Sequence, residues 1–246
     1  MLPPDAGSSQ TNWKMIFTAK DGDDQASALA LEQLARRYWP SVYAFVRSSG
    51  RDVHEAADLT QGFVCDVMLG RNLFHEADPK RGRFRTLLLR SLQNYLRERY
   101  RFANRKKRSP ESGKLTSLDD SHMHMTAIAP GVTPEEAFNF EWGATLVRGV
   151  LELVRRNCVA DGFESHWVVF ESRVVRPMLF GEKPASYQTL VERLDLDDRS
   201  QAANMLITVK RRFARTLMAE TGRTLSDPAR AKYEIMEILE DLERSS

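Results

Sequence analysis

The sequence has no long apolar run and very few cysteines. No stretch approaches the roughly eighteen apolar residues of a membrane span, and the first residues lack the charged and apolar regions of a signal peptide. Only 2 cysteines occur among 246 residues, Cys65 and Cys158, and each lies inside an apolar helical pattern. We therefore expect a cytoplasmic protein with no membrane association, in which both thiols are free and buried.

Familiar catalytic motifs are missing as well. The chain has no Gly-x-x-x-x-Gly-Lys-Ser/Thr phosphate loop, no Gly-x-Ser-x-Gly turn and no His-Glu-x-x-His motif. His122 and His124 form a His-x-His pair, but no Cys or acidic cluster with ligand spacing surrounds them. Cys65 near His54 or His75 would be a nucleophile on an apolar helix face, which disfavours a thiolate. We expect no catalytic activity, no cofactor and no metal.

Proline and alternating apolar patterns are also scarce. The 10 prolines fall mostly in a few short segments, and apolar residues recur every three or four residues far more often than every two. With 42% hydrophobic and 28% charged residues, the composition is that of an ordinary globular protein. These patterns predict an all-α fold.

Several helices are predicted in the first half, after a loosely structured segment up to residue 24. One runs over 24–38, Pro40 opens the next, and Gly50 ends that helix. The inward positions of the first of these are Leu29, Leu31, Leu34 and Tyr38. A capping box at Asp52–Glu55 then starts a helix that continues to about residue 69. Asp58 and Gln61 lie off its apolar stripe, so they should face outward.

A second helical region is predicted from residue 134. Pro134 in the first turn, followed by two glutamates, is a typical helix start. The apolar stripe of this helix is Phe138, Trp142, Leu146, Val150, Leu151 and Val154. Another helix spans 164–179 and ends before Gly181. Its predicted inward residues are Trp167, Phe170, Val174, Val175 and Leu179.

Residues 186–218 have the outline of a helix-turn-helix: a short helix, an acidic turn without glycine, and a longer helix. Polar residues near the start of the longer helix would then be presented to a DNA groove, and the basic residues after them to phosphates. The candidates are Arg199, Ser200, Gln201, Asn204, Thr208, Lys210 and Arg211. Any αα-hairpin would fit the same pattern, so the outline alone leaves DNA reading open.

Basic residues are concentrated in one segment. Residues 80–108 contain twelve Lys or Arg and a single acid, Glu98, although the net charge of the whole chain is only +2. The apolar spacing predicts a helix from about residue 83, with a row on another side formed by Arg90, Asn94, Arg97, Arg101 and Arg105. Like charges at this spacing repel, so the row favours an anionic partner along its length, and nucleic-acid phosphates fit best. A solvated helix face is the alternative.

Three segments carry a family resemblance. They are Tyr38–Phe45 (YWPSVYAF), Ala57–Phe63 (ADLTQGF) and Asp78–Arg85 (DPKRGRFR), followed in order by Asn94. Together they resemble bacterial RNA polymerase sigma factors of the extracytoplasmic-function (ECF) class, especially the long planctomycete-like variants. The likeness covers region two of that family at 27–108 and region four at 136–220, and it implies two helical domains joined by a flexible linker.

The resemblance also implies partners. Asp58 and Gln61 would bind core RNA polymerase, and the helix-turn-helix would read the minus-thirty-five promoter element. The minus-ten element would be engaged and melted by Lys80, Arg81, Arg83, Arg85, Arg90, Asn94, Arg97, Arg101 and Arg105. The chain departs from the family at Ala57, where an acid is usual, and in the turn Leu194–Asp198, where the family commonly has Leu-Gly and one capping Ser.

The expected plan has five parts. They are an N-terminal extension (1–26), region two (27–108), a linker (109–133), region four (134–220) and an acidic C-terminal helix (221–246). The expected function is that of a sigma factor, which directs transcription initiation by binding core polymerase and recognising and melting promoter DNA; an anti-sigma factor is a further expected partner. The alternative is a free-standing helix-turn-helix transcription regulator. Such regulators usually dimerise, whereas a sigma factor is expected to be monomeric when free.

Overall fold

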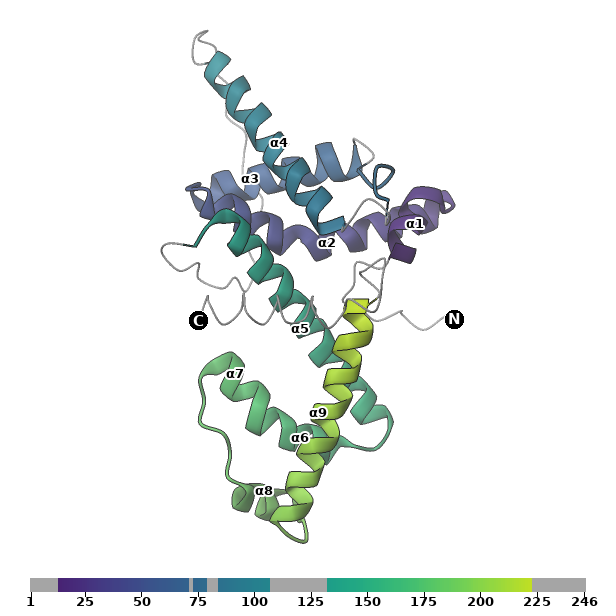
Figure 1. Cartoon of the computed structure of the whole chain (residues 1–246), viewed down its shortest axis with the longest axis vertical. Helices are drawn as coiled ribbons and strands as arrows, with labels where there is room; N and C mark the ends of the chain where they lie inside the picture. Colours follow the sequence, from purple (N-terminus) through teal and green to yellow (C-terminus); the bar gives the residue numbers. More distant parts are fainter. Residues whose placement is uncertain (1–12, 71–72, 79–83, 107–131, 223–246) are drawn as a thin grey trace. The chain divides into compact units, whose positions relative to one another are not determined.

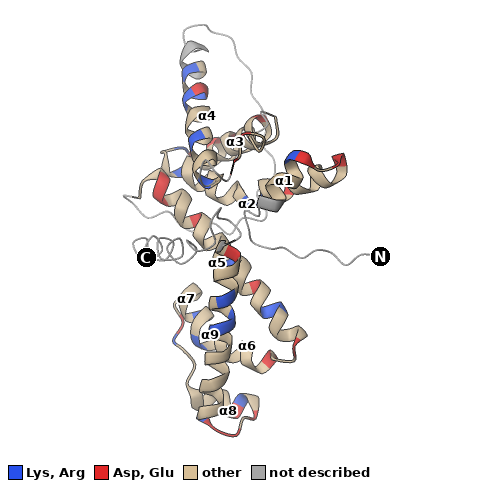
Figure 2. Cartoon of the chain, turned by 45° about the vertical axis from the view of Figure 1, so that its right-hand side comes forward, with Lys and Arg blue, Asp and Glu red and all other residues tan. Residues whose placement is uncertain are grey.

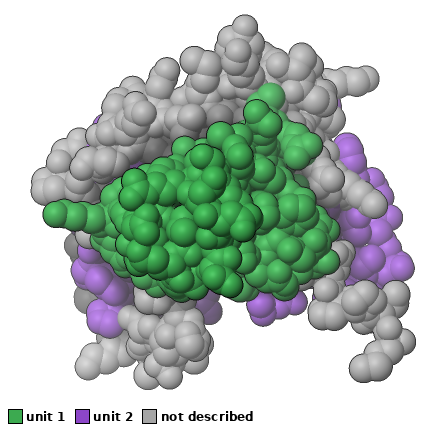
Figure 3. Space-filling view, turned by 90° about the horizontal axis from the view of Figure 1, so that it is seen from below, with its two compact units in different colours: residues 1–9, 146–220 green, residues 10–145, 221–246 purple. Residues whose placement is uncertain are grey.

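The computed structural model describes residues 13–70, 73–78, 84–106 and 132–222, and within these ranges helices joined by turns make up the whole chain (Figure 1). The predicted all-α fold is thus confirmed for the described residues. None of their helices has both the length and the apolar character needed to span a membrane. The chain divides into two compact units, unit 2 (Gln10–Thr145 with Thr221–Ser246) and unit 1 (Met1–Ser9 with Leu146–Glu220) (Figure 3).

Unit 2 packs its helices around a cluster of aromatic rings. Its elements are α1 (Trp13–Asp21), α2 (Asp24–Ser48), α3 (Val53–Phe63), the π-helical turn η1 (Val64–Leu69), α4 (Phe84–Lys106) and the first turns of α5 (Pro134–Ala160). The ring centre of Phe84, at the start of α4, lies 5.4 Å from that of Tyr38 and 5.4 Å from that of Phe74. Because Phe84 is only 2% exposed, the first turn of α4 is fixed in the core of this unit.

The beginning of the chain is more ordered than predicted. Residues up to 24 were expected to be loose, but α1 forms and packs on α2, with Ile16 fully buried and Ala19 6% exposed. Leu29, predicted to face inward, is 52% exposed, because Ala30 and Leu34 supply the buried face of α2 instead.

The predicted break at Pro40 is wrong. One helix, α2, runs from Asp24 to Ser48 with Pro40 inside it. A proline in a helix interior costs about 3 kcal/mol through a lost hydrogen bond and a steric clash. Residues 41–46 that follow are all buried, so packing outweighs that cost. Gly50, with φ +84°, ends α2 as predicted.

The two cysteines differ in burial. Cys158 is fully buried, as predicted, and burial raises the pKa of its thiol. Cys65 is exposed, which contradicts the predicted buried thiol. It lies in η1, where Val67 and Met68 face inward and Cys65 faces out. A π-helical turn changes the phase of the side chains, so the apolar stripe of α3 does not continue regularly into it.

Unit 1 contains the rest of α5, then α6 (Glu164–Phe170), the π-helical turn η3 (Glu171–Val175), α7 (Arg176–Phe180), α8 (Tyr187–Leu194) and α9 (Arg199–Gly222). The predicted stripe of α5 is buried, and so are Trp167, Phe170 and Val175, but Val174 is only half-buried and Leu179 at the end of α7 is 47% exposed, contrary to prediction. As in η1, the π-helical turn shifts the phase of the residues after it. Gly181, with φ +65°, ends α7 where the sequence placed the break.

Candidate nucleic-acid interface

The middle of α4 separates an apolar face from a basic face. Leu88 and Leu92 are fully buried. Arg90, Asn94 and Arg97 are exposed, and so is Arg101 one turn further on. Since these four residues recur every three or four positions, they form one exposed row, which we call the cationic row; Figure 2 shows the basic residues along α4. The row therefore lies where the sequence placed it.

The far end of α4 extends beyond the packed part of unit 2 (Figure 1). Every residue from Arg97 to Phe102 is exposed, and the rings of Tyr100 and Phe102 are 60% and 54% exposed. Tyr95, by contrast, is 3% exposed and belongs to the core, as predicted. Exposed rings between arginines are suited to stacking on unpaired bases, which contributes about 1–3 kcal/mol per base.

Other predicted minus-ten residues fall outside the row or outside the structure. The guanidinium carbon of Arg85 lies 4.6 Å from the centre of the Trp142 ring, and Arg85 is half-buried. Lys80, Arg81 and Arg83 lie outside the described residues, as do the side chain of Arg105, residues 109–131 of the predicted linker with His122 and His124, and the acidic segment after residue 222. The structure thus brings Arg90, Asn94, Arg97 and Arg101 together and separates Arg85 from them.

One arginine of α4, Arg99, is held instead by a tyrosine of its own helix and by an aspartate of η1. Arg99 donates to the hydroxyl of Tyr95 (Nε to Oη, 2.9 Å) and to Asp66 (Nη2 to Oδ2, 3.0 Å). The hydrogen bond to Tyr95 raises the pKa of Arg99. Gly62 makes this arrangement possible, because a Cβ at this position would lie 2.3 Å from the Tyr95 hydroxyl oxygen. The sequence analysis missed this network, and the only sequence signal for it is that Arg99 lies in phase with the apolar stripe.

Asp58 and Gln61 form a separate exposed pair on α3. The helix is capped by Asp52, whose carboxylate accepts from the Glu55 N–H at 2.8 Å and whose pKa this bond lowers. Thr60 is buried between the two exposed residues. Asp58 and Gln61 are three residues apart and therefore share one side of α3. Their predicted outward orientation is confirmed.

The turn of the helix-turn-helix outline is closed without glycine. Asp195 adopts the left-handed conformation (φ 51°, ψ 53°) and ends α8, with the N–H of Leu196 donating to the Val191 carbonyl at 3.1 Å. Asp is among the few non-glycine residues that tolerate this region. Asp198 then caps α9, accepting from the Gln201 N–H at 2.7 Å. Two of the three acids of the turn, Asp195 and Asp198, thus have a local structural role.

The candidate groove-facing residues of α9 are only partly available. Arg199 donates twice to Gln188 of α8, at 3.1 and 3.0 Å, and the Gln201 side chain accepts from the Asp197 N–H at 2.7 Å. The Thr208 hydroxyl donates to the Asn204 carbonyl at 2.9 Å. Four other candidates have exposed side chains that are not among the side-chain donors and acceptors just named: Ser200, Asn204, Lys210 and Arg211.

Arg212, one of the basic residues of α9 expected to face phosphates, is instead engaged within unit 1. Its guanidinium donates to Asp161 at 2.6 Å and lies 4.4 Å from the centre of the Phe163 ring. Burial, and then the charge of Arg212, lowers the pKa of His166, whose ring meets Phe163 edge-on. Arg212 therefore fastens α9 to the turn before α6 within unit 1. The 51-residue separation of Arg212 from Asp161 leaves no local signal in the sequence.

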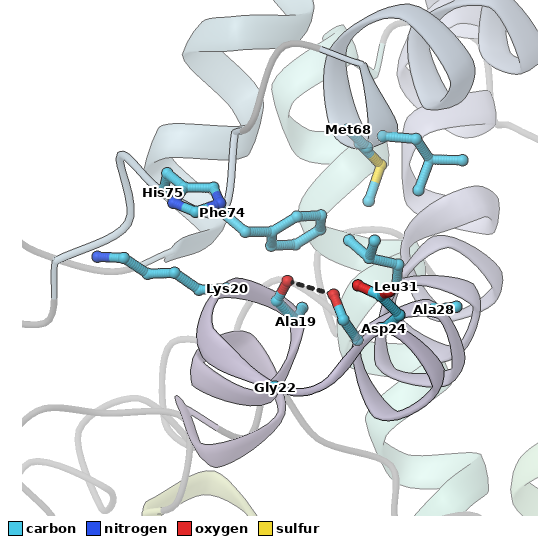
Figure 4. A pocket seen from close by; sticks show the side chains of 11 residues that line it. Ala19, Lys20, Gly22, Asp24, Ala28, Leu31, Met68, Phe74 and His75 are labelled. Carbon is cyan, nitrogen blue, oxygen red and sulfur yellow. Dashed lines mark hydrogen bonds between the residues drawn. The ribbon is translucent and has the colours of Figure 1, made fainter.

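A cavity of about 330 Å³ opens between α1, α2 and η1 in unit 2 (Figure 4). Its apolar lining includes Leu31, Met68, Leu69 and Phe74. Lys20, Asp24 and His75 also line it, so both signs of charge are present and no ligand class is singled out. Across the described chain, no group of three His, Cys, Asp or Glu residues converges as metal ligands would. The α4 surface is the site with a defined chemical preference.

No protein-family model, curated protein or solved structure matches this chain.

Proposed function

We propose that the protein is an RNA polymerase sigma factor of the extracytoplasmic-function class, which binds core polymerase and recognises and melts promoter DNA. The observation that carries the proposal is the cationic row on α4 together with the exposed rings of Tyr100 and Phe102 beyond it. A row of cations matches a phosphate backbone, and rings at its end match unpaired bases. Opening a duplex requires both.

The separate pair on α3 supports a second partner. Asp58 and Gln61 are exposed and lie off the basic helix, so a protein could bind them while α4 holds DNA. The sequence resemblance assigns this pair to core polymerase. In the same proposal α9 reads the minus-thirty-five element through Ser200 and Asn204, with Lys210 and Arg211 on phosphates. A free-standing regulator would bind DNA through the α8–α9 hairpin alone. That function would not explain the cationic row on α4.

The proposal is tested on polymerase loaded with the full chain. Promoters are first selected from a random duplex library, and strand opening is then followed by permanganate reactivity of unpaired thymines. Arg90→Glu and Arg97→Glu should each reduce opening at least tenfold, because each places an acid against phosphate, and co-elution with polymerase should be unchanged. The control is Glu98→Gln, next to Arg97, which should open promoters normally. Normal opening by both charge reversals would refute the assignment of this face.

A further inference from the structure

The opening turns of α5 belong to unit 2 rather than to the region-four segment that the sequence predicts from residue 134. A capping box fixes the start of this helix: the Thr133 hydroxyl accepts from the Glu136 N–H at 3.2 Å, and the Glu136 carboxylate accepts from the Thr133 N–H at 2.8 Å. One face of the following turns is then buried, through Ala137, Phe138, Glu141 and Trp142. The segment 134–145 is thus part of the core of unit 2.

Two side-chain contacts join this segment to α4. Gln93 donates from Nε2 to Glu135 Oε1 at 2.8 Å, and the Arg85 guanidinium stacks on the ring of Trp142. Gln93 and Arg85 are eight residues apart on α4, and their partners follow in reverse order seven residues apart on α5. These similar separations in reverse order indicate that the two helices pass each other antiparallel over about two turns.

These contacts divide the polar residues of α4 between two faces. Arg85 and Gln93 are half-buried and face α5, whereas Arg90, Asn94 and Arg97 are exposed. Arg85 is also close enough to Tyr38 for its charge to lower the pKa of that phenol, against the larger effect of burial. A guanidinium stacked on an indole and partly removed from water is held more firmly than a surface cation. The stacking on Trp142 and the partial burial leave Arg85 less open to a phosphate than the exposed residues of the cationic row.

We propose that Arg85 and Trp142 are positioning residues, which hold the base of α4 so that the cationic row is presented to nucleic acid, and that Arg85 itself does not contact the nucleic acid. The inference rests on the proposed function and deepens it, because it separates the basic residues of α4 into those that bind and one that orients. It also makes the start of α5 a working part of the nucleic-acid-binding unit.

The first test measures the salt dependence of binding to a mixed-sequence single-stranded oligodeoxynucleotide, using the full chain. Each lost phosphate contact lowers the slope of log K against log salt by about 0.7 for single strands. Arg90→Gln should lower the slope by about this amount. Arg85→Gln is the same chemical change, but it should leave the slope unchanged because no phosphate contact is lost. It should weaken binding by no more than about threefold, since it lowers only the fraction of the free protein in which α4 is correctly placed to bind. An equal loss of slope in the two variants would overturn the inference.

The second test does not depend on nucleic acid. In a double-mutant cycle of urea unfolding, Arg85→Gln should change the folding equilibrium constant about 2- to 30-fold in the wild type and far less in Trp142→Phe, where the ring is a poorer cation acceptor. Gln93→Ala with Glu135→Ala gives a matched cycle at the half-buried polar contact between the same two helices, for use if Trp142 variants unfold. Failure of the wild type to bind DNA would count against the proposed function, while absence of coupling in both cycles would refute the positioning role.

Discussion

Gly62 shows how one residue on α3 controls the placement of α4. Alanine normally stabilises a helix relative to glycine by about 1 kcal/mol. Here the added Cβ would lie 2.3 Å from the hydroxyl oxygen of Tyr95, whose ring is fixed by an edge contact with Phe63 at 5.7 Å. Gly62→Ala should therefore lower the free energy of unfolding, by about 1–2 kcal/mol in urea denaturation.

The control for Gly62 removes the colliding atom. In a Tyr95→Phe background the hydroxyl is gone, so the same Gly62→Ala change should be neutral or stabilising. Equal destabilisation in both backgrounds would show that the close approach to Tyr95 is not the cause.

Tyr38 makes stability depend on pH at the alkaline end. Complete burial raises the pKa of Tyr38 from 10.0 to about 12, while the nearby charges of Arg37 and Arg85 act in the opposite direction. The unfolded chain releases this proton near pH 10 and the folded chain keeps it until about pH 12. Between these two pH values the ionisation of Tyr38 therefore lowers the free energy of unfolding, by about 1.4 kcal/mol for each pH unit.

Tyr38→Phe isolates this contribution. Among the described residues the buried Tyr38 hydroxyl makes no hydrogen bond of full geometry, although the Trp142 side chain is close enough to act on its pKa, so removing the hydroxyl should change stability at pH 7 little. The difference in unfolding free energy between wild type and Tyr38→Phe should stay constant from pH 6 to 9 and shift in favour of the variant above pH 10. A constant difference up to pH 11 would contradict the raised pKa.

Among the secondary-structure elements, the turn between α8 and α9 contains one residue, Asp195, whose backbone conformation would suit glycine better. Asp195 occupies the left-handed region without glycine, which costs up to about 1–2 kcal/mol for an L-residue. Asp195→Gly should raise the free energy of unfolding by about 0.5–1 kcal/mol, after allowing for the greater freedom of glycine in the unfolded chain.

Two further substitutions at Asp195 separate conformation from charge. Asp195→Asn keeps a tolerant side chain and removes the charge, so stability should hardly change. Asp195→Val should lose about 1 kcal/mol or more in thermal or urea unfolding, because a β-branched residue fits this region poorly. A Gly variant no more stable than the Val variant would show that the turn is not strained.

Most helices could be predicted from the sequence because their apolar residues recur with the helical period. The stripe of α4 and the outward side of α3 followed from spacing alone, and Gly50 and Gly181 marked real ends. Failures occurred where tertiary packing overrides a local rule. Pro40 is tolerated inside α2 because the six residues after it are buried. Cys65 faces outward because the π-helical turn η1 shifts the side-chain positions relative to the apolar stripe of α3.

At the scale of the whole molecule, the candidate site could be predicted only in part. The cationic row follows from the spacing of residues within one helix. Two contacts join residues that are far apart in sequence, and no local sequence pattern predicts either of them. They are the stacking of Arg85 on Trp142 and the pairing of Arg99 with Asp66. For the same reason the division of the chain inside α5 could not be predicted, since the proline and glutamates at residues 134–136 mark the start of a helix but not the unit that it joins.

We propose that the whole chain joins core RNA polymerase through one face of α3 while α4 binds promoter DNA. Size-exclusion co-elution with purified bacterial core polymerase tests it most directly, with wild type, an Asp58→Ala/Gln61→Ala double variant and Arg90→Glu run in parallel. Wild type and Arg90→Glu should co-elute with polymerase, whereas the double variant should elute alone although it remains folded by circular dichroism. Elution of the wild type apart from polymerase, or co-elution of the double variant as complete as that of the wild type, would contradict the account.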